Sequence, residues 1–237
     1  MKKKYLDIYN ELVMSIRDRS FRAGERLPSE HELCERYDTS RETIRKALHL
    51  LAQNGYIQKV RGKGSIVLDS DKYEFPVSGL TSFKELTHQS GQQIRTKVHE
   101  LYLLEPDTKL DELLDNPGKV PIWRVVRSRE IDGEKVILDK DYIRQDIVPG
   151  LTKTICEDSL YEYIENKLGL SISYAKKEIV VEPVSEEDKE LLDVENHDQM
   201  VVIRSSVYLE DTTLFQFTES RHRPDKFRFV DFARRSK

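Results

Sequence analysis

Two pairs of arginines stand at spacings that bring both guanidinium groups of a pair onto one surface. Arg41 and Arg45 are four residues apart, about one helical turn, and Arg127 and Arg129 flank Ser128, as on one face of a strand. A guanidinium fork matches the O6 and N7 acceptors of guanine and also the oxygens of a phosphate. The first pair predicts base recognition in a DNA major groove, and the second predicts an anion site.

Each pair also has a plainer interpretation. Arg41 and Arg45 could belong to a solvated basic face, and Arg127 and Arg129 could pair with surface acids. Two arginines side by side on a sheet repel each other unless an anion or carboxylates lie between them. Both interpretations of the second pair therefore require negative charge beside it.

Further residues could complete an anion site around Arg127 and Arg129. Ser82 at a helix start would contribute amide donors and the positive end of a helix dipole. Ser159 and Tyr161 would contribute hydroxyl groups. Arginines, a helix start and hydroxyls together predict a phosphate pocket.

The charge is distributed unevenly along the 237 residues. The formal net charge is −4, but residues 1–70 carry +4 and residues 71–237 carry −8. Because phosphate contacts need local positive charge, the N-terminal part is the one expected to meet a polyanion. A chance imbalance is the alternative.

Composition excludes several classes of protein. At 38% hydrophobic and 35% charged residues, the chain is typical of a soluble globular protein with one or two domains. It shows neither a membrane-spanning run nor an apolar signal segment after its basic start, so we expect a cytoplasmic protein without a membrane partner. Cys34 and Cys156 are too few and too far apart for a secreted disulfide framework.

Three helices are predicted in the N-terminal part. Apolar residues recur at helical spacing over 4–19, and Ser29 with Glu32 forms a capping box for a helix through Tyr37. Ser40 is a candidate N-cap of a third helix that continues to Asn54. Three helices with a short turn between the last two are typical of a helix-turn-helix.

A basic hairpin is predicted after the third helix. Two short strand-like runs, 56–60 and 65–68, are joined by Arg61, Gly62, Lys63 and Gly64. The glycines allow close backbone approach and the cations supply charge, as a wing against the DNA backbone or minor groove requires.

The C-terminal part alternates strands and hairpin turns. We expect a linker at 69–78, a short helix capped by Thr81 or Ser82, and turns at Asp132–Gly133 and Glu210–Asp211. Strands are predicted at 94–104, 122–131, 136–143, 172–182, 199–209 and 212–221, and helices near 159–168 and 185–192. This order predicts an α+β fold with an antiparallel sheet.

Enzyme signatures do not stand out. The histidines are scattered, and neither a metal-binding motif nor a phosphate loop occurs, so we expect no cofactor. Asp139 and Asp141 could act as the acid and nucleophile of a glycosidase, but they are two residues apart on one predicted strand and adjoin no recognisable cleft motif. We expect a binding protein rather than a sugar-phosphate-processing enzyme.

The N-terminal part resembles the winged-helix domain of the GntR family of bacterial repressors. The resemblance is carried by residues 27–30, 32–33, 40–48, 51, 55 and 62–64. It implies that Arg41 and Arg45 read bases and that Arg61 and Gly62 approach the minor groove. The DNA-contacting set expected for this sequence is His31, Ser40, Arg41, Thr43, Arg45, Lys46, Arg61, Gly62, Lys63 and Gly64.

Residues 79–237 resemble the UTRA effector domain of the HutC-like branch of that family, whose fold is similar to chorismate lyase. The domains expected are thus 1–68, a winged helix, and 79–237, an effector-binding and dimerisation domain, joined by the linker. The resemblance implies a phosphate held by Ser82, Phe83, Arg127, Arg129, Ser159 and Tyr161, and sugar hydroxyls held by Asp139, Gln216 and His222.

The same resemblance implies a homodimer on two-fold operator DNA, released by a phosphorylated sugar. Stretches at 49–59, 139–142, 171–175, 218–223 and 229–235 look most similar to the trehalose operon repressors of Gram-positive bacteria. That likeness implies trehalose 6-phosphate as the effector, with another phosphosugar, such as an amino-sugar phosphate, as the alternative.

The assignment of Asp139 makes a geometric demand. A two-residue turn at Asp132–Gly133 with regular pairing would put Asp139 on the face opposite the arginines. A three-residue loop, Ile131 to Gly133, would shift the register by one residue and bring Asp139 to their face. We therefore expect the three-residue loop.

Overall fold

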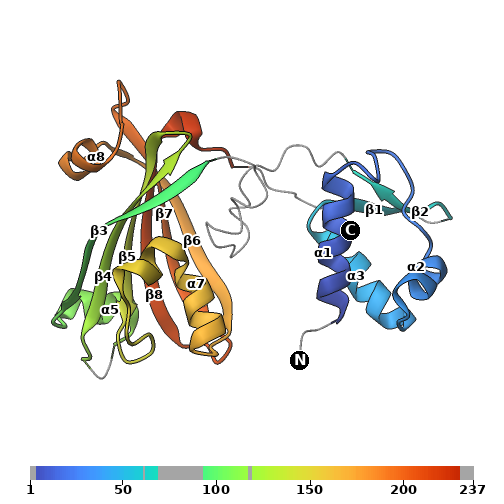
Figure 1. The fold of residues 1–237 in the computed structure, drawn as a ribbon, viewed down its shortest axis with the longest axis horizontal. Coiled ribbons are helices and arrows are strands. Elements are labelled where there is room, and N and C mark those ends of the chain that lie inside the picture. The colour runs from blue at the N-terminus through green and yellow to red at the C-terminus, as the bar shows by residue number, and fades with distance from the viewer. Residues whose placement is uncertain (1–3, 61, 69–92, 117–118, 230–237) are drawn as a thin grey trace. The chain divides into compact units, whose positions relative to one another are not determined.

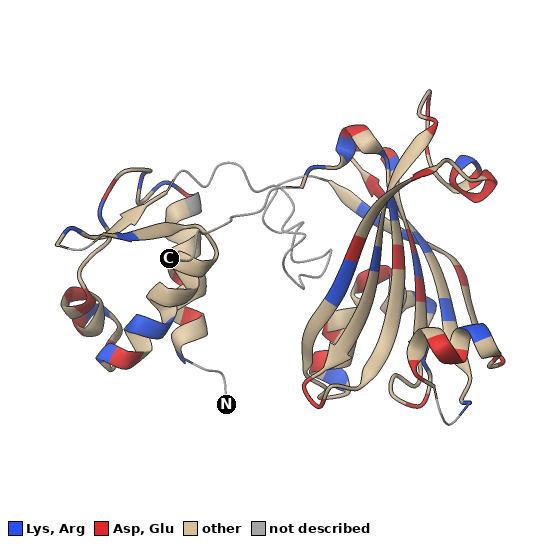
Figure 2. Ribbon diagram, turned by 180° about the vertical axis from the view of Figure 1, so that it is seen from behind, with Lys and Arg blue, Asp and Glu red and all other residues tan. Residues whose placement is uncertain are grey.

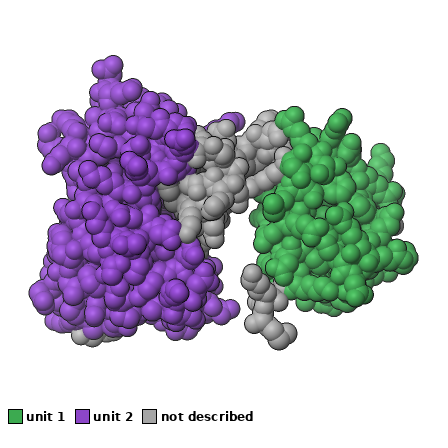
Figure 3. All heavy atoms as spheres, in the orientation of Figure 1, with its two compact units in different colours: residues 1–76, 230–237 green, residues 77–229 purple. Residues whose placement is uncertain are grey.

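The computed structural model describes residues 4–60, 62–68, 93–116 and 119–229 (Figure 1). These residues fall into two compact units, which Figure 3 shows in two colours. The described residues up to 68 form the first unit, here called the head, and residues 93–229 form the second, called the body. The predicted linker, Ser82, Phe83 and the predicted helix after Thr81 lie outside the described residues.

The head consists of three helices and a two-stranded hairpin. The predicted capping box is confirmed: Ser29 and Glu32 each accept a hydrogen bond from the other's backbone N–H. Ser40 likewise caps the third helix by accepting from the backbone N–H of Thr43. The elements are α1 (Lys4–Arg17), α2 (Glu30–Tyr37), α3 (Arg41–Gln53), β1 (Ile57–Val60) and β2 (Gly64–Val67).

One apolar core holds the head together. The stripes predicted from helical spacing meet there, with Leu12 of α1, Leu33 of α2 and Leu48 of α3 all buried. Ile57 and Val67 of the hairpin pack into the same core. Because α3 buries its apolar side, its other side, with Arg41 and Arg45, faces outward.

The body is built on one antiparallel sheet of six strands in the order β3-β4-β5-β8-β7-β6. The predicted strands all form, and those predicted at 136–143, 172–182 and 212–221 have ends shifted by one or two residues. The last strand begins later because the preceding hairpin loop extends to Thr213. The strands are β3 (Ile94–Leu104), β4 (Ile122–Ile131), β5 (Glu134–Arg144), β6 (Ile172–Pro183), β7 (Gln199–Leu209) and β8 (Leu214–His222).

Short helices cover both faces of this sheet (Figure 1). The predicted helix near 159–168 is divided into an α-helical start and a π-helical turn, and the helices at 108–114 and 153–158 were not predicted. The helices are α5 (Thr108–Leu114), α6 (Lys153–Asp158), α7 (Leu160–Glu162), the π-helical η1 (Tyr163–Lys167), α8 (Glu186–Leu191) and the 3₁₀ turn η2 (Pro224–Lys226).

Two apolar clusters lie on opposite faces of the sheet. On one face, which we call the site face, Val125 and Ile143 pack against Cys156 and Leu160 of the α6–α7 segment. On the other face, Val126 and its neighbours pack beside the end of α8. Polar side chains on the site face are therefore shielded from water at the end that α6 and α7 cover.

The β4–β5 hairpin corrects one prediction. Its loop has two residues, Asp132 and Gly133, both with positive φ (52° and 91°), and Ile131 pairs directly with Glu134. The three-residue loop was therefore wrong. A β-bulge makes the register shift instead, because Glu130 pairs with Lys135 but Arg129 pairs with Ile137.

The bulge brings Asp139 to the face of the sheet on which the three-residue loop was expected to place it. Val136 is the extra residue on β5, and beyond it Asp139 stands directly opposite Arg127. Side chains of directly opposed residues share a face, so Asp139 lies on the site face with the arginines. The predicted position of Asp139 is confirmed, although by a different element of the backbone.

Candidate functional site

The two arginines of α3 share one carboxylate. Glu30, at the start of α2, accepts through Oε2 from Nε of Arg41 and from Nε of Arg45, both at 3.1 Å. The Arg41 and Arg45 side chains are 71% and 62% exposed, and their terminal nitrogens have no hydrogen-bond acceptor among the described residues. The guanidinium groups are thus held at their inner nitrogens while their forks face solvent.

Glu30 was not predicted, and its chemistry suits the position. Partial burial opposes ionisation, yet hydrogen bonds from Arg41 and Arg45 hold the pKa of Glu30 below its usual range. The ionised carboxylate reduces the repulsion between two cations that are one helical turn apart. It also restricts the rotamers of both side chains before any partner arrives.

Replacing Glu30 with glutamine is expected to weaken sequence discrimination while leaving non-specific DNA affinity equal or higher. The amide cannot neutralise both guanidiniums, so the forks lose their order but the head gains net positive charge. Glu42→Gln is the matched control, because Glu42 pairs with Lys46 instead. The ratio of affinities for a preferred and a scrambled duplex should fall several-fold in Glu30→Gln and stay constant in the control.

Further basic residues accompany this arginine pair in the head, where Figure 2 shows Lys and Arg in blue and Asp and Glu in red. A surface hollow of about 1100 Å³ beside α3 is lined by Arg41, Arg45, Lys46, His49 and Lys59, together with Tyr5, Leu50 and two acids. Cations at its rim suit contacts to a phosphate backbone.

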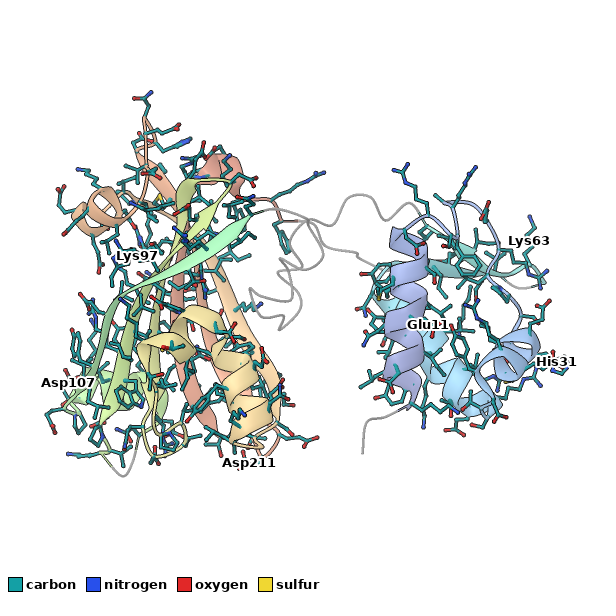
Figure 4. All side chains as sticks on the ribbon, in the orientation of Figure 1. Glu11, His31, Lys63, Lys97, Asp107 and Asp211 are labelled. Carbon is teal, nitrogen blue, oxygen red and sulfur yellow. The ribbon has the colours of Figure 1, made fainter. Side chains whose placement is uncertain are left out.

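Three more of the predicted DNA-contacting residues lie on α2 or at the start of α3. Ser40 and Thr43 are used in the α3 cap, and their hydroxyls are 2.9 Å apart. His31 projects outward from α2, 82% exposed, with Glu35 as its neighbour (Figure 4).

The predicted wing forms the β1–β2 hairpin. Figure 4 marks Lys63 at its tip, and Gly62 and Gly64 both have positive φ, at 77° and 85°. A Cβ at Gly64 would meet the Arg26 side chain at 2.8 Å, so glycine permits the close packing there. Arg61 lies outside the described residues, and its role remains a prediction.

In the body, Arg127 and Arg129 are buried, each 5% exposed, and paired with carboxylates. Arg127 Nη2 donates to Asp141 Oδ2 at 2.6 Å, and its Nη1 donates to the carbonyl of Cys156 at 3.1 Å. Arg129 Nε donates to Asp139 Oδ2 at 2.9 Å. The acids that the sequence left open as partners therefore exist, but they are buried on β5 rather than on the surface.

Strand β8 completes this polar cluster from the other side of β5. Gln216 and Thr218 both donate to Asp141 Oδ1 at 2.8 Å, and Ser220 donates to Asp139. Because the Ser220 hydroxyl donates its hydrogen bond to the Asp139 carboxylate, its oxygen acts as the acceptor for Nε2 of His222, 3.1 Å away. The structure thus joins five of the nine predicted effector residues: Arg127, Arg129, Asp139, Gln216 and His222.

Of the other four predicted residues, two are described. Ser159 is buried and accepts from the backbone N–H of Glu162, which caps α7. Tyr161 follows on that helix, where burial and nearby Asp141 raise the pKa of its phenol above the usual value. Both come from the segment whose Cys156 carbonyl holds Arg127, so they border the cluster.

Four residues of the cluster were not predicted from the sequence as binding residues: Thr96, Asp141, Thr218 and Ser220. Thr96 of β3 accepts from Arg129 Nη1. Thr218 and Ser220 alternate with the predicted Gln216 and His222 on one strand, so the two-residue period could have identified them. Asp141 stands in the same relation to Asp139.

His222 predicts a pH dependence of stability. Burial lowers its pKa to about 4 in the folded body, with Asp139 partly opposing, against 6.5 when unfolded. The unfolded state therefore binds more protons between these values, and stability falls as pH is lowered through that window. From pH 8 to pH 5 this residue should remove about 2 kcal/mol from the free energy of unfolding.

Urea unfolding followed by the fluorescence of Trp123, the single tryptophan, measures this effect. His222→Gln should flatten the pH profile by that amount. His197→Gln, which removes a half-buried histidine beside Asp225, should leave the profile steep. An equally steep profile in His222→Gln would refute the assignment.

Within the described ranges, no group of three or more His, Cys, Asp or Glu side chains is arranged to hold a metal ion. Nor is any helix there long and apolar enough to cross a membrane.

Comparison with known proteins matches both units. The family model "Bacterial regulatory proteins, gntR family" matches residues 4–67, and the model "UTRA domain" matches residues 89–228. The chain is 60% identical over 234 residues to the HTH-type transcriptional regulator TreR of Bacillus subtilis, covering 99% of this chain and 98% of that protein.

Two solved structures are similar to the chain. The possible transcriptional regulator YydK from B. subtilis matches with a TM-score of 0.80 and 28% identity, over 98% of this chain and 99% of that one. The effector-binding domain of the B. subtilis trehalose repressor (TreR) matches with a TM-score of 0.55 and 62% identity, over 60% of this chain and 99% of that domain.

Proposed function

Because the chain belongs to the GntR family of bacterial transcriptional regulators and carries a UTRA domain, we propose that it represses a trehalose-utilisation operon. The family model describes bacterial regulatory proteins, and the similar TreR protein is a transcriptional regulator rather than an enzyme. Operator DNA would be its macromolecular partner, and a phosphorylated sugar, trehalose 6-phosphate, would release it.

The observation that carries this proposal is the arginine pair of α3. Two exposed forks, held at their inner nitrogens by Glu30, stand at the N-terminal end of a helix in a helix-turn-helix. Recognition helices use that end to contact base edges, and each bidentate arginine–guanine pair contributes about 1–3 kcal/mol of discrimination. Structural arginines would instead bury their terminal nitrogens.

The effector assignment draws on two supports. The TreR protein and the trehalose repressor domain of B. subtilis are 60% and 62% identical to this chain. The buried cluster of Arg127, Arg129, Asp139 and Gln216 offers cationic donors and several hydroxyl-binding groups side by side. A phosphate with an attached sugar presents the complementary chemistry.

The proposed mechanism is a homodimer joined through the bodies, which presents two heads to a two-fold operator. Half-site spacing would follow from the dimer geometry. Effector binding would favour an arrangement in which the heads no longer match adjacent half-sites. Such coupling is typically about 1–3 kcal/mol, enough for a 5- to 150-fold change in operator affinity.

Titration calorimetry of the full chain with sugars tests the effector class. Trehalose 6-phosphate should bind, with glucosamine 6-phosphate and unphosphorylated trehalose much weaker. Equal binding of trehalose and its phosphate would refute the phosphate assignment. Tighter binding of glucosamine 6-phosphate than of trehalose 6-phosphate would identify the effector as an amino-sugar phosphate instead.

A further inference from the structure

We propose that Asp141 is a positioning residue that fixes the Gln216 side chain as a hydrogen-bond acceptor, so that the effector site reads a hydroxyl group. The inference rests on the proposed function in taking the ligand to be trehalose 6-phosphate. It adds a residue outside the expected set and the direction of the hydrogen bond that Gln216 makes with the ligand.

Asp141 organises three strands through one buried carboxylate. It is 1% exposed. Its Oδ2 accepts a hydrogen bond from Arg127 Nη2 at 2.6 Å, and its Oδ1 accepts from the side chains of Gln216 and Thr218, both at 2.8 Å. Removing this carboxylate would leave a guanidinium, an amide and a hydroxyl without their common partner.

The chemistry of a carboxylate determines which end of the Gln216 amide faces it. A carboxylate that is ion-paired with a guanidinium only accepts hydrogen bonds, so Gln216 must turn Nε2 toward Asp141. Its Oε1 then points away from Asp141. That oxygen is buried and has no hydrogen-bond partner among the described residues. A buried carbonyl in this state favours a ligand group that donates.

Arg127 shows the complementary condition. Its two terminal nitrogens are taken by Asp141 and the Cys156 carbonyl, whereas its Nε is buried without a partner in the described part of the chain. This nitrogen donates, so it favours a ligand oxygen that accepts. Both unpartnered atoms belong to side chains that donate a hydrogen bond to Asp141.

Together these two atoms orient a sugar phosphate in the site. A hydroxyl can donate to Gln216 Oε1, whereas a phosphate oxygen would repel that carbonyl. The phosphate therefore belongs toward Arg127 and Arg129 on β4, and a hydroxyl of the sugar belongs beside Gln216 on β8. An acceptor-only substituent such as fluorine at that hydroxyl should be rejected.

Calorimetry with a panel of trehalose 6-phosphate analogues, each with one hydroxyl replaced by fluorine, tests the proposal on the full chain. For at least one position, the wild type should bind the fluorinated analogue roughly tenfold more weakly than the parent. Asp141→Asn should reduce this ratio to within about twofold, because an asparagine amide can also donate, which lets the Gln216 amide reverse.

Two further variants separate positioning from folding. Thr218→Val, the matched control, removes another donor to the same Asp141 oxygen and should keep the tenfold ratio. Gln216→Met deletes the acceptor at nearly unchanged volume and should lose the ratio even if Asp141→Asn does not fold. Thermal unfolding of each variant reports on folding separately.

The outcomes distinguish this inference from the proposed function. Tight binding of trehalose 6-phosphate with no discrimination at any position would overturn the role of Asp141 and Gln216 and leave the repressor intact. Discrimination that persists in Asp141→Asn would overturn the positioning role. Failure of the wild type to bind trehalose 6-phosphate would overturn the effector assignment, and this inference with it.

Discussion

Replacing Arg127 with alanine is expected to abolish the effector response and to lower the free energy of unfolding of the body by about 3–5 kcal/mol. The guanidinium is buried and neutralises Asp141, so its loss leaves a carboxylate in the interior without its counter-ion. The Cys156 carbonyl loses its donor Nη1, and a phosphate of the ligand would lose the donor Nε. Urea unfolding followed by Trp123 fluorescence measures the first effect.

A control from the same strand identifies what is specific to Arg127. Arg124 points to the opposite face of the sheet, where it pairs with the more exposed Glu100 and Glu187. Arg124→Ala should cost about 1 kcal/mol or less and retain the effector response, because water can solvate the carboxylates it leaves. An Arg127→Ala protein that still leaves its operator on adding trehalose 6-phosphate would rule out the proposed pocket.

Replacing Arg41 with alanine is expected to remove most of the sequence preference of the head. If its fork contacts a guanine, the loss should be about 1–3 kcal/mol of discrimination, or 5- to 150-fold in the ratio of preferred to scrambled DNA. The affinity for scrambled DNA should fall only slightly, because the head loses a single positive charge. Fluorescence anisotropy with both duplexes at one fixed salt concentration gives the ratio directly.

Arg36→Ala provides the matched loss of charge. Arg36 lies on α2 and pairs with Glu11 of α1, away from the Glu30 pair. It should change both affinities by the same factor and leave their ratio unchanged. A ratio that is as high in Arg41→Ala as in Arg36→Ala would mean that Arg41 does not read bases.

The head could be predicted from the sequence nearly residue by residue. Its determinants are local: helical spacing of apolar residues, the Ser29–Glu32 capping box and the Ser40 cap. Glu30 was missed because its role depends on how α2 packs against α3. The sequence places Glu30 eleven residues before Arg41, and only tertiary structure makes them neighbours.

In the body, strand order and register decided what could be predicted. The arginines on one face of β4 follow from the two-residue period, but their partners depend on the bulge at Val136. The sequence carries no clear signal for that bulge, so Asp139 was placed on the right face through the wrong loop. Asp141 became recognisable as the centre of the cluster once β8 was found beside β5.

Selection of operator DNA by the protein itself tests the central claim most directly. The full chain should enrich duplexes with two-fold-symmetric, guanine-containing half-sites from a random pool at low ionic strength, and trehalose 6-phosphate should release them, whereas trehalose should not. Enrichment of no sequence, or a selected complex that is indifferent to trehalose 6-phosphate, would contradict the account.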